Sequence, residues 1–121
     1  MQHAPGFLSL VADAKTRVAE VTVEELVQRG IERFVLIDVR EDHEWAAGHA
    51  VGATHLGRGI LERDVEKAFP DKRAPLVLYC GGGYRSALSA DSLQKMGYTQ
   101  VSSLAGGWKA WCAAGRPTEP G

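Results

Sequence analysis

Residues 76–86, LVLYCGGGYRS, run from four apolar residues through a cysteine and three glycines into a helical pattern. The apolar run is typical of a buried strand, and the pattern after the glycines predicts a helix that begins at Tyr84. Three consecutive glycines let the backbone curl closely around the sulfur of Cys80. The free N–H groups of a helix N-terminus and a nearby cation, here Arg85, both stabilise a thiolate. We therefore interpret Cys80 as a nucleophile held in an anion-binding cradle.

Two other interpretations of this stretch were weighed against that one. Cysteine is among the most buried residue types, so Cys80 could be inert core at the end of its strand. The glycines favour a functional site, because glycine is common where backbone approaches a ligand closely. A nucleotide site is disfavoured, since residues 81–83 lack both the GxGxxG spacing and the Lys-Ser/Thr pair of a P-loop.

On either side of this stretch, strands alternate with helices. Apolar runs at 34–39 and 101–104 predict strands, and a short extended segment is expected around 54–56. Thr22 and Glu25 form a capping-box pattern at the start of one helix. Helical patterns cover residues 7–18, 22–30, 41–48, 60–69, 84–97 and 108–114. This order predicts an α/β domain with a mainly parallel central sheet flanked by helices on both faces.

The strand ends bring polar residues towards Cys80. Asp38 and Arg40 stand at the end of the 34–39 run, as Cys80 does at the end of the 76–79 run. Ligands of parallel sheets bind beyond the carboxyl ends of the strands. We therefore expect the two stretches to meet in space.

Composition limits the possible classes of function. A chain of 121 residues suits one domain with its own core. Lys and Arg number 14 against 15 Asp and Glu, for a net charge of −1 without a basic block, so no nucleic-acid partner is expected. Cys80 and Cys112 belong to no CxxC or Cys/His spacing, so no disulfide and no metal site is predicted. Cys112, next to Trp111, is expected in the core.

The two ends of the chain carry weaker signals. The first ten residues do not form a leader, and no apolar run reaches spanning length, so we expect a soluble, cytoplasmic protein without a membrane partner. The helix at 7–18 is expected to have a structural role. The tail at 115–121 contains two prolines and little to bury, and is expected to fray.

Four patches of the sequence together resemble the rhodanese-like sulfurtransferases. The resemblance spans about residues 21–117, which implies an N-terminal helical extension at 1–20, a rhodanese-like domain at 21–117 and a frayed tail at 118–121. Val51 and Arg116 depart from the family pattern, away from the proposed chemistry. The matching residues are Asp38, Arg40, Glu44, Trp45, Gly48, His49, Gly52 and Ala53; the six-residue loop from Cys80 to Arg85, followed by Ser86; Ala90, Leu93, Gly97 and Tyr98; and Leu104, Gly106, Gly107 and Trp108.

The resemblance implies an enzyme that moves a sulfane sulfur through a persulfide on Cys80, without a metal or a cofactor. The expected partners are a small anionic donor such as thiosulfate and an acceptor that is cyanide, a thiol or a protein. Arg85 either orients the donor or caps the loop. The residues expected to cradle substrate and persulfide are Gly81, Gly82, Gly83, Tyr84, Arg85 and Ser86.

Asp38, Arg40 and His49 are expected to support this site without touching substrate. An Asp-x-Arg pair at a strand end more often fixes a loop by hydrogen bonds and an ion pair. An ionised thiol needs no general base, so His49 is interpreted as a hydrogen-bonding residue of its turn. His43 and His55 are given no role.

Two rival functions remain beside sulfur transfer. Cysteine-dependent phosphatases use Cys-x5-Arg, whereas Arg85 follows Cys80 after four residues, with Ser86 at the phosphatase arginine position and Tyr79 where a histidine is common. The shorter loop suits a single sulfur better than a phosphate, so phosphatase activity is expected to be absent. The other rival is a non-enzymatic module: the intact loop and Arg85 disfavour a mere interaction surface, whereas a sulfur carrier with a protein acceptor stays open.

Overall fold

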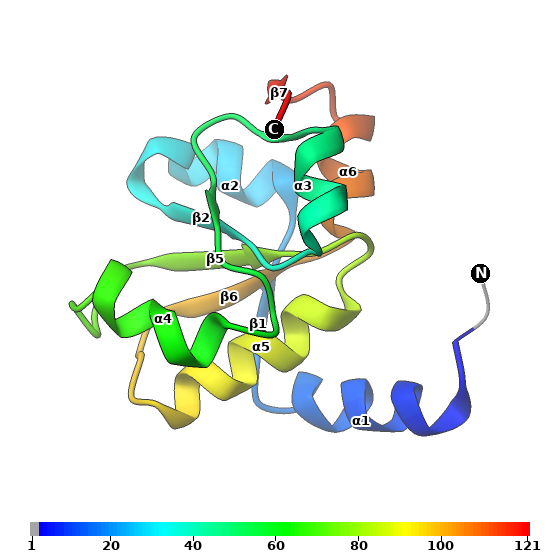
Figure 1. Ribbon diagram of the computed structural model, residues 1–121, viewed down its shortest axis with the longest axis vertical. Coiled ribbons are helices and arrows are strands. Elements are labelled where there is room, and N and C mark those ends of the chain that lie inside the picture. Colours follow the sequence, from blue (N-terminus) through cyan, green and yellow to red (C-terminus); the bar gives the residue numbers. More distant parts are fainter. Residues whose placement is uncertain (1–2) are drawn as a thin grey trace.

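A five-stranded parallel sheet forms the middle layer of the computed structural model, which describes residues 3–121 (Figure 1). Its strand order is β1-β6-β5-β2-β4, and every pairing is parallel. The strands are β1 (Ala19–Val21), β2 (Val35–Asp38), β4 (Thr54–His55), β5 (Leu76–Tyr79) and β6 (Val101–Leu104). The predicted sheet is confirmed, and β5 is its central strand, so Cys80 emerges in the middle of the sheet edge.

Helices cover both faces of the sheet, as predicted. α2 (Val23–Arg29) and α6 (Gly107–Ala113) lie on one face, and α4 (Leu61–Ala68) and α5 (Tyr84–Lys95) on the other (Figure 1). α1 (Pro5–Lys15) packs outside α5 and so forms an additional layer. The remaining elements are the 3-10 helix η1 (Ile31–Arg33), α3 (Asp42–Ala47), and the two short strands β3 (His49–Ala50) and β7 (Thr118–Glu119).

The side chains of β5 divide between two cores. All four residues of β5 are buried, as its apolar run predicts. Leu76 and Leu78 join the cluster packed against α4 and α5, together with Cys80. Val77 and Tyr79 join the cluster packed against α2 and α6. Because side chains alternate along a strand, the strand that fills both cores also fixes the face on which the Cys80 sulfur lies.

Two helices begin with reciprocal capping boxes. The predicted one is confirmed: Thr22 Oγ1 accepts from the Glu25 N–H at 3.1 Å, and Glu25 Oε1 accepts from the Thr22 N–H at 3.0 Å. Glu41 and Glu44 form the same arrangement at the start of α3, which the sequence pattern did not reveal to us. The second box holds the Glu44 side chain at the helix N-terminus, beside the Cys80 loop.

Three features differ from the sequence predictions. β1 was not predicted, because only Val21 of its three residues is buried. The tail, expected to fray, pairs as β7 with β3, and the Trp111 indole N–H donates to the Pro117 carbonyl at 2.9 Å. The prediction that Cys112 lies in the core was wrong: its side chain is exposed, because α6 turns Trp111 inward.

The division of the chain into an extension, a domain and a tail stays a prediction, and its first boundary, at residues 20 and 21, lies inside β1. Within the described residues, no helix has the length and apolar character needed to cross a membrane.

Candidate active site

The Cys80 sulfur lies where the backbone turns from β5 into α5. Its side chain is nearly inaccessible, with 1% of the residue exposed. Sγ accepts from the Gly83 N–H at 3.1 Å and from the Ser86 N–H at 3.4 Å. Gly83 has φ of 100°, a left-handed conformation that favours glycine. Two backbone donors and the positive end of α5 therefore surround one sulfur atom, which stabilises an anionic form of it.

Buried hydroxyl groups lie beneath this sulfur. Ser86 Oγ is 3.5 Å from Cys80 Sγ and 2.8 Å from Ser103 Oγ on β6. Both serines are fully buried. Sequence reasoning included Ser86 in the cradle but missed Ser103, because only the pairing of β5 with β6 brings it near. The hydroxyl pair is therefore a further polar neighbour of the sulfur, and either Ser86 Oγ or Sγ could be the donor in their contact.

The N-terminus of α6 fixes the same loop from behind. The Cys80 carbonyl accepts from the Trp108 N–H at 2.7 Å, and the Gly81 carbonyl accepts from the Lys109 N–H at 3.2 Å. Gly107 lies so close that a Cβ atom there would collide with the Cys80 carbonyl. The glycine pair before Trp108 therefore allows a close backbone approach, and this contact sets where Cys80 stands.

Arg85 is held by an ion pair with α3. Its Nη1 and Nη2 donate to Glu44 Oε1 and Oε2 at 3.0 and 3.2 Å. The hydrogen bonds from Arg85 hold the pKa of Glu44 below its usual value, and those to Glu44 raise the pKa of Arg85. Sequence reasoning left Arg85 as either a donor ligand or a loop cap. In the structure the guanidinium is anchored to Glu44 and also lines the pocket above Cys80.

Asp38 and Arg40 form a buried pair beside the loop. Arg40 Nη2 lies 2.8 Å from Asp38 Oδ2 and donates to the Gly48 carbonyl at 2.7 Å. The guanidinium also stacks over the Trp108 ring, with 4.5 Å to its centroid. Neither side chain lines the pocket above Cys80. The pair ties the end of β2 to the turn after α3 and to α6.

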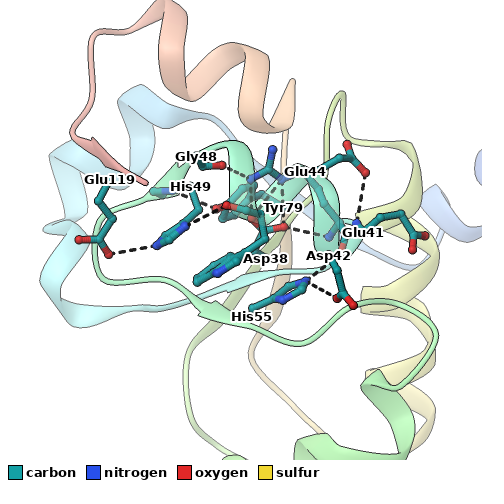
Figure 2. Close-up of polar contacts among 12 residues, drawn as sticks. Asp38, Glu41, Asp42, Glu44, Gly48, His49, His55, Tyr79 and Glu119 are labelled. Carbon is teal, nitrogen blue, oxygen red and sulfur yellow. Dashed lines mark hydrogen bonds and ion pairs between the residues drawn. The ribbon is translucent and has the colours of Figure 1, made fainter. Parts of the chain in front are cut away.

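His49 lies in a separate contact with the tail. Its Nε2 is 3.1 Å from Glu119 Oε1 of β7 (Figure 2). Its ring stacks on Trp45, with 3.4 Å between the ring centroids. His55 Nε2 lies 2.9 Å from the Arg40 carbonyl. Neither histidine lines the pocket above Cys80. In the structure His49 therefore packs between Trp45 and the tail, and its role stays a prediction.

A cavity of about 590 Å³ opens above Cys80. Its lining comes from four separate parts of the chain: the segment entering α1, α3, the Cys80 loop and α6. Sequence reasoning missed Lys109, His3 and Phe7, because they reach the pocket only through the packing of α6 and of α1 with the residues before it. The lining residues are His3, Phe7, Glu44, Cys80, Gly81, Gly82, Tyr84, Arg85 and Lys109. Among the described residues, no group of three His, Cys, Asp or Glu side chains converges to hold a metal ion.

The rhodanese-like domain model matches residues 22–114, which is most of the chain. The chain belongs to the rhodanese-like family. This match includes the Cys80 loop, Asp38, Arg40 and α6, but it begins after α1, so two of the rings that line the pocket lie outside the rhodanese-like domain.

Relatives of this rhodanese-like chain include sulfurtransferases. It is 33% identical to the thiosulfate sulfurtransferase GlpE of Coxiella burnetii over 80% of this chain and 87% of that protein. It is 36% identical to the uncharacterized protein YqhL of Bacillus subtilis over 78% of this chain and 74% of that protein. These likenesses assign the chain to a sulfurtransferase family.

A solved structure also matches nearly the whole rhodanese-like chain. It is a protein of unknown function from Rhodopseudomonas palustris, described as a possible tyrosine phosphatase. The identity is 29%, the TM-score is 0.84, and the match covers 98% of both chains. The shared architecture therefore extends beyond the family domain to both ends of the chain.

Proposed function

We propose that this protein transfers a sulfane sulfur from a small anionic donor such as thiosulfate to a thiophilic acceptor, cyanide or a thiol, through a persulfide on Cys80. The observation that carries the proposal is the pair of N–H groups, from Gly83 and Ser86, that point at a sulfur at the bottom of a pocket. Such donors stabilise the anionic sulfur before and after transfer.

The proposed reaction has two balanced steps. The Cys80 thiolate attacks the outer sulfur of thiosulfate; the new S–S bond forms on Sγ, the S–S bond of the donor breaks, and sulfite leaves with the bonding electron pair. The Cys80 persulfide is again a monoanion. An acceptor such as cyanide then attacks its outer sulfur, thiocyanate leaves, and the thiolate is restored. No redox cofactor or metal is needed for either step.

The near-complete burial of Cys80 favours sulfur as the transferred group. A single terminal sulfur can approach Sγ end-on, through the opening above the loop. Arg85 and Lys109 both line this opening and supply positive charge for the anionic remainder of the donor. The positive charge of Arg85 is partly offset by Glu44, so Lys109 is expected to share donor binding.

Phosphatase chemistry is the rival that the name of the R. palustris structure raises. It needs an arginine and several loop N–H groups arranged around a tetrahedral phosphate. Here Ser86 occupies the position after Arg85, and its Oγ is buried against Ser103. The loop therefore has no cation at the position of Ser86, where a phosphatase has its arginine. For this reason we propose sulfur transfer instead of phosphate hydrolysis. A pure sulfur carrier remains the closer alternative, since it would use the same persulfide.

The test is thiocyanate formation from thiosulfate and cyanide, with the intact mass of the protein recorded after exposure to thiosulfate alone. Wild type should form thiocyanate and gain one sulfur atom, and Cys80→Ala should lose both signals. Cys112→Ala removes the other, exposed cysteine and should keep both. A sulfur adduct without thiocyanate would indicate a carrier. Cys80-dependent hydrolysis of an aryl phosphate, without any sulfur adduct, would overturn the proposal.

A further inference from the structure

Three aromatic side chains form one side of the pocket above Cys80. The ring centroids of His3 and Tyr84 are 4.5 Å apart, those of His3 and Phe7 5.2 Å, and those of Phe7 and Tyr84 6.1 Å. These separations lie within the range of favourable aromatic pairs. Tyr84 belongs to the cysteine loop, whereas His3 and Phe7 come from the segment before the family match. We call these three residues the aromatic wall.

α1 is also attached to the domain by contacts outside this wall. Val11 and Ala14 of α1 are buried, with 3% and 1% exposed. Arg17, which follows α1, adds two hydrogen bonds to Asp91 of α5, at 3.0 and 2.9 Å. The C-terminal half of the helix and Arg17 therefore supply anchors that are separate from the wall. Phe7 and His3, at the other end, stay partly exposed and face the cavity, which leaves their surfaces free to contact a ligand.

The pocket is larger than an inorganic donor requires. A cavity of about 590 Å³ lies in the range of roughly 300–1,000 Å³ that holds organic ligands. Thiosulfate presents only polar oxygens to its surroundings, so it gains little from aromatic rings. Lys109, for which the described part of the chain offers no ion-pair partner, lines the same pocket. An apolar wall together with a cation matches an anion that carries an organic group.

We propose that the aromatic wall is a subsite for the organic group of a sulfur donor, so that the enzyme prefers organic sulfane-sulfur anions, such as thiosulfonates and organic persulfides, over thiosulfate. The inference rests on the proposed function of Cys80. With a thiosulfonate, the Cys80 thiolate attacks the terminal sulfur, the S–S bond forms on Sγ, and the donor's S–S bond breaks. The organic sulfinate then leaves with the electron pair, and charge is conserved.

The test compares kcat/KM for benzenethiosulfonate, methanethiosulfonate and thiosulfate, with cyanide as acceptor. Wild type should prefer the benzene donor. Phe7→Ala should lower kcat/KM for that donor by about three- to tenfold, the worth of an aromatic contact, and leave thiosulfate within about twofold. Phe7→Tyr keeps a ring and should keep the preference. Leu10→Ala changes an exposed residue of the same helix that does not line the pocket, and should have no effect.

A second readout does not require sulfur transfer. Benzenesulfonate, which carries no transferable sulfur, should protect Cys80 from iodoacetamide better than methanesulfonate does, as followed by mass spectrometry of the Cys80 peptide. Phe7→Ala should remove that difference. Two outcomes would overturn the subsite. One is equal protection of Cys80 by both sulfonates. The other is an equal decrease of kcat/KM for all three donors in Phe7→Ala, with unchanged thermal stability. Failure of every donor with protection intact would instead overturn the proposed function and leave the subsite supported.

Discussion

Glu44 and Arg85 together set much of the charge that faces the pocket above Cys80. Their side chains pair through two hydrogen bonds at the pocket edge. The hydrogen bonds from Arg85 hold the pKa of Glu44 below its usual value, so the carboxylate is ionised throughout the neutral range. A group with a lowered pKa keeps its contribution above its unfolded pKa and loses it as pH falls through the lowered value. The pair therefore persists at any pH at which sulfur transfer would be assayed.

Replacing Glu44 by Gln should lower KM for thiosulfate about threefold, because the Arg85 cation then faces the dianion without a competing carboxylate. The measurement is KM and kcat by thiocyanate formation. Asp42→Asn is the matched control, since it removes the same charge from the first turn of the same helix on a fully exposed side chain. A higher KM in Glu44→Gln would show instead that the carboxylate is needed to hold Arg85 in place.

Two residues of the site, Ser103 and Lys109, could not be predicted from the sequence. The loop from Cys80 to Ser86 is contiguous, so its pattern of residue types could be interpreted directly. In the sequence, the rest of α5 lies between this loop and Ser103 or Lys109. These two residues approach the loop only because β6 pairs with β5 and α6 returns to the loop. Long-range pairing leaves no local pattern that marks such residues as neighbours.

The contact between α6 and the Cys80 loop positions the reactive sulfur. Trp108 and Lys109 donate their N–H groups to the loop carbonyls, and Gly107 passes against the Cys80 carbonyl itself. Arg40 stacks over Trp108 and so connects the end of β2 to the same helix. The loop is thus held by α6, and by β2 through Arg40 and Trp108, as well as by its own turn.

Replacing Gly107 by Ala should lower the rate of persulfide formation at least tenfold, since displacement of a reacting atom by about 1 Å can cost roughly 100-fold. The rate is measured from intact mass after mixing with thiosulfate. Gly97→Ala is the matched control: Gly97 also has a left-handed φ, of 102°, but open space where a Cβ would lie. Equal losses in both variants would indicate backbone strain and would contradict a specific role for the contact with Cys80.

The secondary structure was predictable where the residues of an element themselves show a pattern typical of a strand or a helix. Apolar runs located β2, β5 and β6, and the Thr22 capping box located α2. β1 and β7 have two or three residues each, mostly exposed, and exist because a distant partner strand offers its free edge. Their formation depends on tertiary pairing, so no local composition could indicate them.

Across the whole molecule, an ion pair joins the N-terminal helix to the family domain. Arg17 donates to both carboxylate oxygens of Asp91, and these hydrogen bonds hold the pKa of Asp91 below its usual value. Lys95 also lies 3.5 Å from Asp91, and Asp13 shares Arg17. Because the lowered pKa belongs to the folded state, this attachment is complete at neutral pH and weakens only in strong acid.

Replacing Asp91 by Asn should loosen α1 at pH 7. Amide exchange of α1 should quicken by roughly two- to fivefold, the modest effect expected of a pair that is half open to solvent. Exchange in β5 should be unchanged. Hydrogen exchange followed by NMR measures both, and Asp64→Asn, whose partner Arg63 lies in the same helix, serves as the control. Faster exchange throughout the chain would mean that the pair stabilises the whole domain.

The pocket draws its reactive sulfur and two of the three rings of its aromatic wall from different parts of the chain. The loop, α3 and α6 lie within the family domain, whereas Phe7 and His3 lie before it. Neither His3 nor Phe7 supplies an N–H group to Cys80, since those donors are Gly83 and Ser86. Under the proposed subsite, replacement of the leading segment would change the preferred donor while the chemistry at Cys80 stays the same.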